Sequence, residues 1–372
     1  MHLVTVDDLK LLEPRVRVVW SGSVSECQFE APLFVTGSAA QQFAEEHHRS
    51  LSNPAPALYA IADAQVHRYG CVVWDDCVLG GEGWPGLPSF TAPAARLLGL
   101  AASEYFRNTT PAIKPRCVSG VALLLARPGD DIYGHWLIDI FPIVWLAIRS
   151  GMRPQYILQK DTPEYALQWL RASGTSDSSL IFYDPESDVL QVECLVVSPG
   201  LRRGNCLHEE LREYRDWFEV LAAAQAPRKS RGNRRIFASR RSWTSPRREL
   251  LNRNMIEDRF RARGFELYEP ESDPLAAQIS MFRQARWLVG ESGSALHNSI
   301  FCAPGSLIGV LGAAQRRPLI QSRLCKIFDQ KIAYAVGEAL LRAQSRDFRA
   351  LAPYVIAPTI VDEFLDRLET AA

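Results

Sequence analysis

The sequence predicts an α/β protein with two doubly wound parallel sheets and a β-rich N-terminal portion. From Cys117 onward, short apolar runs alternate with helical patterns, and a second series of the same kind begins at Ile236. Such alternation is typical of parallel sheets covered by helices. The length of 372 residues favours two domains, because single cores rarely grow beyond about 250–300 residues.

Bulk composition is that of a folded protein without a strong net charge. Lys and Arg number 42, as do Asp and Glu, which excludes attraction of the whole molecule to nucleic acid or to an anionic membrane. The eight cysteines form no CxxC and no Cys/His cluster, so we expect reduced thiols and no zinc site. With no signal or membrane segment apparent, we expect a cytoplasmic protein.

Residues 1–226 are expected to hold two different parts. Residues 1–115 read as a β-rich portion, because the runs at 16–20 and 57–76 alternate as half-buried strands do. Residues 116–226 read as the first α/β domain. Its elements are a buried strand at 118–126, an apolar helix at 133–151, strands near 156, 181 and 192, and a helix from 164.

A Pro/Gly/basic segment after residue 226 reads as a linker to a second α/β domain at 232–345. The expected strands lie at 236–239, 265–270, 286–290 and 306–312, with a helix at 247–264 and another opened by Asp273 and Pro274 as cap and first turn. Residues 346–372 are expected to end in a helix that packs back on the first domain.

Small residues follow one of these strands, in the segment VGESGSALHNSIF. Ser292, Gly293 and Ser294 stand between the strand end at 290 and a helix expected from about residue 295. Ligands of open α/β sheets bind outside the carboxyl ends of the strands, and helix N-termini bind anions. We therefore predict a phosphate site here. His297 and Asn298, in the first turns, are further candidates, although packing and local hydrogen bonding explain them equally well.

Cations lie close by in the sequence. Residues 228–248 contain nine Lys or Arg and no acid. Arg240 and Arg241 directly follow the strand at 236–239, so they are expected at the same sheet edge as the small residues. Arg247 and Arg248 open the next helix and are second candidates, since the planar guanidinium binds phosphate oxygens in pairs. The alternative for 228–235 is a solvated basic linker.

A third group of polar residues lies in the first domain, in YGHWLIDIFP. His135 and Asp139 are four residues apart and hence on one face of the predicted helix. Either side chain could act as a general base on a hydroxyl group. The alternative is that they cap and hold the helix. Two such residues without a third do not make a metal site.

Together these motifs resemble glycosyltransferase family 61, also described as a domain of capsular polysaccharide synthesis enzymes. The motifs are YGHWLIDIFP, IFASRR with Arg248 and Asn252 downstream, and FRQARWLVGESGSALHNSIFCAPGS, in the expected order over about residues 116–312. The resemblance implies a GT-B architecture, in which a Rossmann-like acceptor domain and a Rossmann-like nucleotide-sugar domain face each other. It also implies inverting sugar transfer with no cofactor and no required metal.

By position, the resemblance places residues 290–298 and Arg240 against the donor diphosphate, and His135 and Asp139 toward a glycan or lipid-linked acceptor. A lipid-linked acceptor would bring the enzyme to the inner face of a membrane. Many relatives have His where this sequence has Ser292. That departure leaves open a catalytically silent relative that binds a nucleotide or sugar. A nucleic-acid binder using residues 228–248 is a further alternative, which zero net charge disfavours.

Overall fold

The computed structural model describes residues 2–12, 14–37, 47–48, 50–67, 70–80, 114–223, 232–241, 249–314, 319–340 and 352–371. The chain divides into two compact units. The first consists of Met1–Ser25 and Asn53–Gly204, and the second of Glu26–Ser52 and Asn205–Ala372. The division after Gly204 differs from the linker expected after residue 226. Its cause is helix α7 (Leu211–Ala223), which packs against α9 (Leu275–Arg283) of the second unit.

The first unit is built on a mixed sheet. Within the described ranges this sheet has nine strands, in the order β1-β8-β7-β6-β12-β9-β10-β11 with β2 beside β6. The strands are β1 (His2–Thr5), β2 (Val16–Ser21), β6 (Ala57–His67), β7 (Cys71–Trp74), β8 (Cys77–Gly80), β9 (Arg116–Leu124), β10 (Gln155–Gln159), β11 (Leu180–Tyr183) and β12 (Leu190–Val197).

Four of these strands are parallel to one another and come from the second half of the unit's sequence. Read across the sheet, β11, β10, β9 and β12 have the chain order 3-2-1-4, which is half of the Rossmann arrangement. The order reverses between β9 and β12. Ligand sites of open α/β sheets lie at such reversals. The connecting helices are α4 (Tyr133–His135), η3 (Trp136–Ile140), α5 (Phe141–Arg149), α6 (Glu164–Ala172) and η4 (Asp177–Ser179).

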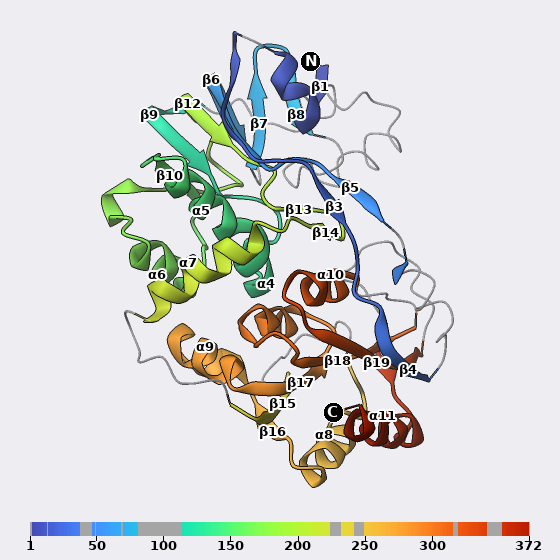
Figure 1. The fold of residues 1–372 in the computed structure, drawn as a ribbon. Helices are drawn as coiled ribbons and strands as arrows, with labels where there is room; N and C mark the ends of the chain where they lie inside the picture. The colour runs from blue at the N-terminus through green and yellow to red at the C-terminus, as the bar shows by residue number, and fades with distance from the viewer. Residues whose placement is uncertain are drawn as a thin grey trace. The chain divides into compact units, whose positions relative to one another are not determined.

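The second unit contains a largely parallel sheet of β15 (Arg234–Ala238), β16 (Glu266–Tyr268), β17 (Ala285–Glu291), β18 (Leu307–Ala313) and β19 (Lys331–Ala339). The spatial order β16-β15-β17-β18-β19 is 2-1-3-4-5 in chain order, the flavodoxin-like doubly wound order, and it reverses between β15 and β17. Figure 1 shows α8 (Arg253–Ala262) and α11 (Pro358–Thr370) on one face and α9 and α10 (Leu319–Ile327) on the other.

The described part of residues 1–115 is rich in strands, but these strands complete the sheets of both units. Strand β6 pairs with β12 of the first unit, whereas β4 (Pro32–Gly37) pairs in parallel with β19 of the second. The remaining elements are η1 (Val6–Leu11), β3 (Ser25–Cys27), β5 (Leu51–Asn53), β13 (Arg202–Arg203), β14 (Cys206–Leu207), η5 (Pro270–Ser272), η6 (Ser294–Phe301) and β20 (Tyr354–Val355).

The C-terminal helix α11 packs on the second unit. Its buried residues Phe364, Leu365 and Leu368 join the core formed by the strands and by Phe260 of α8. This packing differs from the expected return to the first domain. The amphipathic pattern of α11 predicts a buried face, but the local sequence does not specify which sheet that face covers.

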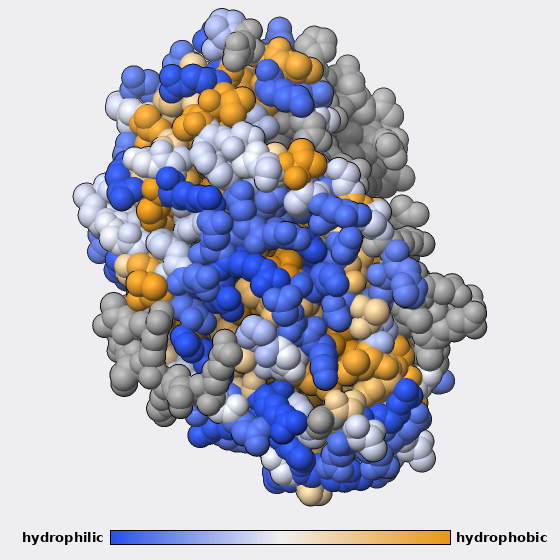
Figure 2. Space-filling model, viewed as in Figure 1, coloured by the Kyte–Doolittle hydropathy of each residue, from blue (hydrophilic) through white to orange (hydrophobic). Residues whose placement is uncertain are grey.

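No helix in the described ranges combines the length and the apolar character required to cross a lipid bilayer. On the face drawn in Figure 2, hydrophilic residues dominate and the hydrophobic ones form separate groups.

Candidate functional site

Two buried charged groups lie in the turn that follows β9 in the first unit. Arg127 is 5% exposed and Asp130 is 8% exposed. The main-chain N–H of Arg127 donates to Asp130 Oδ2 (3.4 Å), and Trp136 Nε1 donates to the carbonyl of Asp130 (2.6 Å). Burial lowers the pKa of Arg127 to about 10 and raises the pKa of Asp130 to about 7. Two ionisable side chains at this edge of the sheet are therefore buried although burial disfavours their charged forms, which is common at functional sites.

His135 lies directly against this turn because residue 129 is glycine. A Cβ atom built on Gly129 would lie 2.6 Å from His135 Nδ1, and Gly129 has a φ of +86° that favours glycine. Burial lowers the pKa of His135, and Arg202 and Arg127 also lower it, whereas the nearby Asp139 opposes this effect. The imidazole is thus uncharged at neutral pH and can accept a proton.

Asp139 belongs to a π-helical turn, η3, inside the predicted helix. Pro142 has no N–H to donate to the carbonyl four residues before it, which favours a widened turn at this point. Single π turns inside helices are frequent at functional sites. The sequence predicted the helix here, but not the change in its hydrogen bonding.

Arg202 of β13, a short strand that follows β12 in the chain, binds Asp139. Its Nη1 donates to Asp139 Oδ2 (2.8 Å), and its Nε donates to the carbonyl of Gly204 (2.8 Å). The two side chains are 26% and 15% exposed. The other carboxylate oxygen, Oδ1, is buried and has no hydrogen-bond partner among the described residues. This leaves one oxygen of a fixed carboxylate with unused capacity to accept a hydrogen bond.

The first-unit cluster, defined here as Arg127, Asp130, His135, Asp139 and Arg202, lies at the reversal between β9 and β12. The two predicted residues, His135 and Asp139, are brought together as expected. Sequence reasoning missed the other three. Arg202 could have been found by the argument used for Arg240, because both arginines follow the end of a parallel strand.

In the second unit, Arg240 and Gly293 lie side by side at the reversal between β15 and β17. Arg240 is 8% exposed, and a Cβ atom on Gly293 would lie 3.4 Å from Arg240 Nη1. The two residues follow neighbouring parallel strands, so their approach is a direct result of the strand order. The predicted meeting of Arg240 with the small residues is present in the structure.

The segment after β17 differs from the predicted α-helix. Residues Ser294–Phe301 form the 3₁₀ helix η6, and the main-chain N–H of Ser292 donates to the carbonyl of Leu311 (2.8 Å). Ser292, Gly293 and Ser294 are partly exposed at the sheet edge. A 3₁₀ turn is tighter than an α turn and has poorer hydrogen-bond geometry. This segment therefore offers a weaker helix dipole to an anion than the predicted α-helix would.

Two other predicted donor residues point into the fold. Asn298 is fully buried and its Nδ2 donates to the carbonyl of Ala295 (3.1 Å). His297 Nδ1 lies 3.4 Å from Gln321 Oε1 of α10. These contacts agree with the packing alternative for both residues. Arg248, the remaining predicted donor residue, lies outside the described residues.

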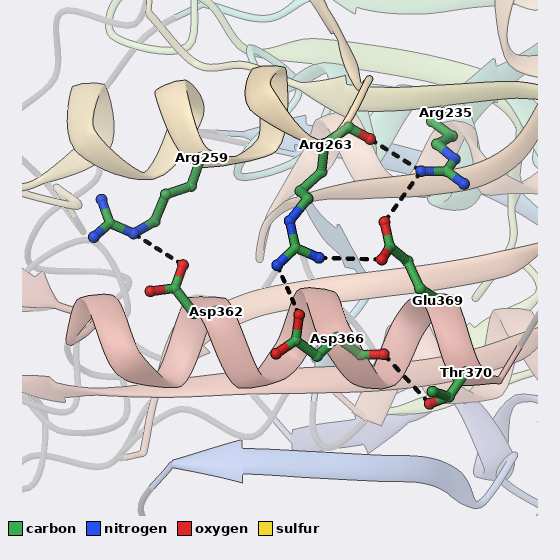
Figure 3. A network of polar contacts seen from close by, with 7 residues as sticks. All are labelled: Arg235, Arg259, Arg263, Asp362, Asp366, Glu369 and Thr370. Atoms are coloured by element: carbon green, nitrogen blue, oxygen red, sulfur yellow. Dashed lines mark hydrogen bonds and ion pairs between the residues drawn. The ribbon is translucent and has the colours of Figure 1, made fainter.

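The basic stretch at 228–248 is extensively paired where the structure describes it. Arg234 binds Glu266 (2.7 Å), and Arg241 binds the buried Glu257 through Nε (3.1 Å). Arg235 packs over the Trp287 ring at 4.2 Å, and Figure 3 shows its contacts with Glu369 and with the carbonyl of Arg263. These pairs reduce the positive charge available to a nucleic acid.

Metal-ligating side chains do not gather in the described ranges, where no group of three or more His, Cys, Asp or Glu is close enough to hold an ion. The candidate site thus consists of two separate sets of residues. The first unit supplies proton acceptors, and the second supplies a buried cation beside small residues.

Residues of both units match a known protein family. A sequence model of the family described as Glycosyltransferase 61 matches residues 133–309. The matched segment contains His135 and Asp139, Arg240, and the residues that follow β17. A comparison with curated proteins gave no match. Residues 133–309 are thus similar to glycosyltransferase family 61, and this similarity supports a glycosyltransferase.

Proposed function

We propose that the protein transfers a sugar, with inversion, from a nucleotide-sugar donor whose diphosphate binds between the ends of β15 and β17. The observation that carries this proposal is the approach of Arg240 to Gly293 at the strand-order reversal. The guanidinium offers paired donors to phosphate oxygens, and a glycine leaves room for a phosphate to approach the backbone.

The proposed chemistry places negative charge where Arg240 lies. The departing nucleoside diphosphate gains charge in the transition state, and fixed donors stabilise it. Loss of one such donor typically costs about 2.7–4 kcal/mol, or a hundredfold to a thousandfold in rate. In this proposal arginine neutralises the negative charge of the phosphates, so a divalent cation is not required.

The acceptor hydroxyl loses its proton to the first-unit cluster in this proposal. Asp139 offers the unpartnered Oδ1, and His135 offers a neutral imidazole because burial lowers its pKa. Both residues are candidates for the base. The acceptor would be a glycan or a lipid-linked glycan, and the pathway would be the assembly of a surface polysaccharide, as the family resemblance implies.

A second candidate function rests on Ser292. Many family members have histidine at this position, and a relative that lacks it would bind donor without turning it over. The two functions share the binding site and differ in catalysis. Release of nucleoside diphosphate, with the sugar transferred to the hydroxyl of an added glycan acceptor or to water, therefore separates them.

The test is a thermal-shift and calorimetric screen of the full chain against UDP, GDP, CMP and their sugar conjugates, with EDTA present. Stabilisation by one nucleotide is expected and would identify its base. Lack of response to every compound would contradict the proposed donor site. Binding without subsequent diphosphate release would favour the silent relative.

A further inference from the structure

A buried carboxylate stands behind the small residues that follow β17. Glu291, the last residue of this strand, is 2% exposed. Its Oε1 accepts a hydrogen bond from Arg253 Nε (2.6 Å), and its Oε2 lies 3.4 Å from the hydroxyl of Tyr354. Nothing in the sequence patterns pointed to Arg253, which lies within a helix rich in arginine.

The fold brings Arg253 to the same sheet edge as Arg240. Arg253 is the first residue of α8, the helix that follows β15, so it lies toward the carboxyl end of that strand. Burial, above all, and Glu291 raise the pKa of the Tyr354 phenol well above its usual value, and the charges of Arg240 and Arg253 oppose the rise.

Arg253 and Glu291 form an ion pair within the fold, and Glu257 of the same helix also acts electrostatically on Arg253. A buried ion pair is weak evidence for stability, because desolvation offsets much of the attraction. Among the described residues, Nε is the only side-chain nitrogen of Arg253 with a hydrogen-bond partner. The side chain is 14% exposed, so its terminal nitrogens are within reach of a ligand.

We propose that Arg253 is a second diphosphate-binding residue, with Glu291 holding its Nε so that the terminal nitrogens bind phosphate oxygens. This inference rests on the proposed donor site and adds a residue to it. Arg240 and Arg253 would approach the diphosphate from the end of β15 and from the start of α8. Two fixed guanidinium groups would then replace the phosphate's hydration shell with oriented donors.

The test is calorimetric titration of the full chain with inorganic pyrophosphate and with the nucleoside diphosphate selected by the screen. The key variant is the double substitution Arg253→Gln with Glu291→Gln, which removes both members of the pair and keeps the net charge. The matched control is Arg234→Gln with Glu266→Gln, an Arg–Glu pair (2.7 Å) that joins the starts of β15 and β16, away from the carboxyl ends of these strands. Thermal melting establishes that each variant is folded.

The expected result is that Kd for both ligands rises by about tenfold to a hundredfold in the Arg253 pair variant, as loss of a charge-assisted hydrogen bond predicts. The control pair should bind within about threefold of wild type. Arg253→Lys keeps the positive charge but lacks the planar guanidinium, so its Kd should lie between that of wild type and that of the Arg253 pair variant. Equal affinity of the two pair variants would overturn the inference while leaving the donor site intact. Failure of the wild-type chain to bind either ligand would overturn both proposals.

Discussion

In the first-unit cluster, burial changes the protonation behaviour of a single residue, Asp130. The carboxyl of Asp130 is surrounded by protein, and its proton is held more tightly in the folded chain than in the unfolded one. A group whose folded pKa is raised from 3.8 to about 7 weakens the fold as pH rises through that window. Retention of such a carboxyl at a sheet edge is typical of functional sites.

Asp130→Asn should therefore stabilise the protein at high pH. We expect a gain of about 1–2 kcal/mol at pH 8 and little change at pH 4, where Asp130 is protonated in the folded state. Urea denaturation at both pH values measures the effect. Asp131→Asn, at the exposed neighbouring position, is the matched control. A variant that lost stability at pH 8 would show that the Asp130 charge is needed by the fold.

At the scale of elements, glycines set where side chains of the site lie. Gly129 and Gly151 have nearly equal φ values, +86° and +82°. A Cβ atom added to Gly129 would clash with the side chain of His135, whereas a Cβ atom added to Gly151 would meet no atom within 4 Å. Substitution by alanine imposes similar backbone strain at both positions. The difference between the two variants isolates the contact with His135.

Gly129→Ala should destabilise the protein more than Gly151→Ala, which pays only backbone strain of about 1–2 kcal/mol. We also expect the NMR signal of the His135 ring to shift in the first variant and to stay unchanged in the second. Equal stability and unchanged His135 signals in both variants would mean that the ring does not pack against Gly129.

The elements that the sequence predicted well are those whose signal is local. Strands β15, β17 and β18 are short apolar runs between turn residues, and their order along the chain placed Arg240 near the small residues. The pairing of β4 with β19 joins segments about 300 residues apart, and no local pattern encodes it. The 3₁₀ geometry of η6 was missed for another reason, since the apolar spacing of 294–301 fits either helix type.

In the first-unit cluster too, the residues with a local sequence signal could be predicted and the long-range contact could not. His135 and Asp139 could be predicted because four-residue spacing puts them on one helix face. Their partner Arg202 lies 63 residues further along the chain and reaches Asp139 only because β12 pairs beside β9. Sequence alone specified the strand, but not its neighbour.

At the scale of the whole molecule, the C-terminal helix completes the core of the second unit. Phe364 is fully buried and its ring lies 5.5 Å from Phe34 of β4 and 6.3 Å from Phe260 of α8. Arg263 binds Asp366 (2.7 Å) and Glu369 (3.1 Å) at the surface of the same helix, as Figure 3 shows.

Phe364→Ala should destabilise the protein by about 3–5 kcal/mol, because it opens a cavity among three elements. Arg263→Ala should cost about 1 kcal/mol or less, since its partners are exposed and screened by solvent. Urea denaturation of both variants makes the comparison. A larger loss for Arg263→Ala would mean that the ion pairs of Figure 3, rather than the apolar face, hold α11 in place.

We propose that donor binding and proton transfer belong to different units of the chain. The most direct measurement is calorimetric binding of the selected nucleoside diphosphate to Arg240→Gln and to Asp139→Asn. The account predicts that Kd rises by about tenfold or more for Arg240→Gln, and that Asp139→Asn binds like wild type while its transferase activity is lost. Wild-type affinity in Arg240→Gln would contradict the placement of the diphosphate between β15 and β17.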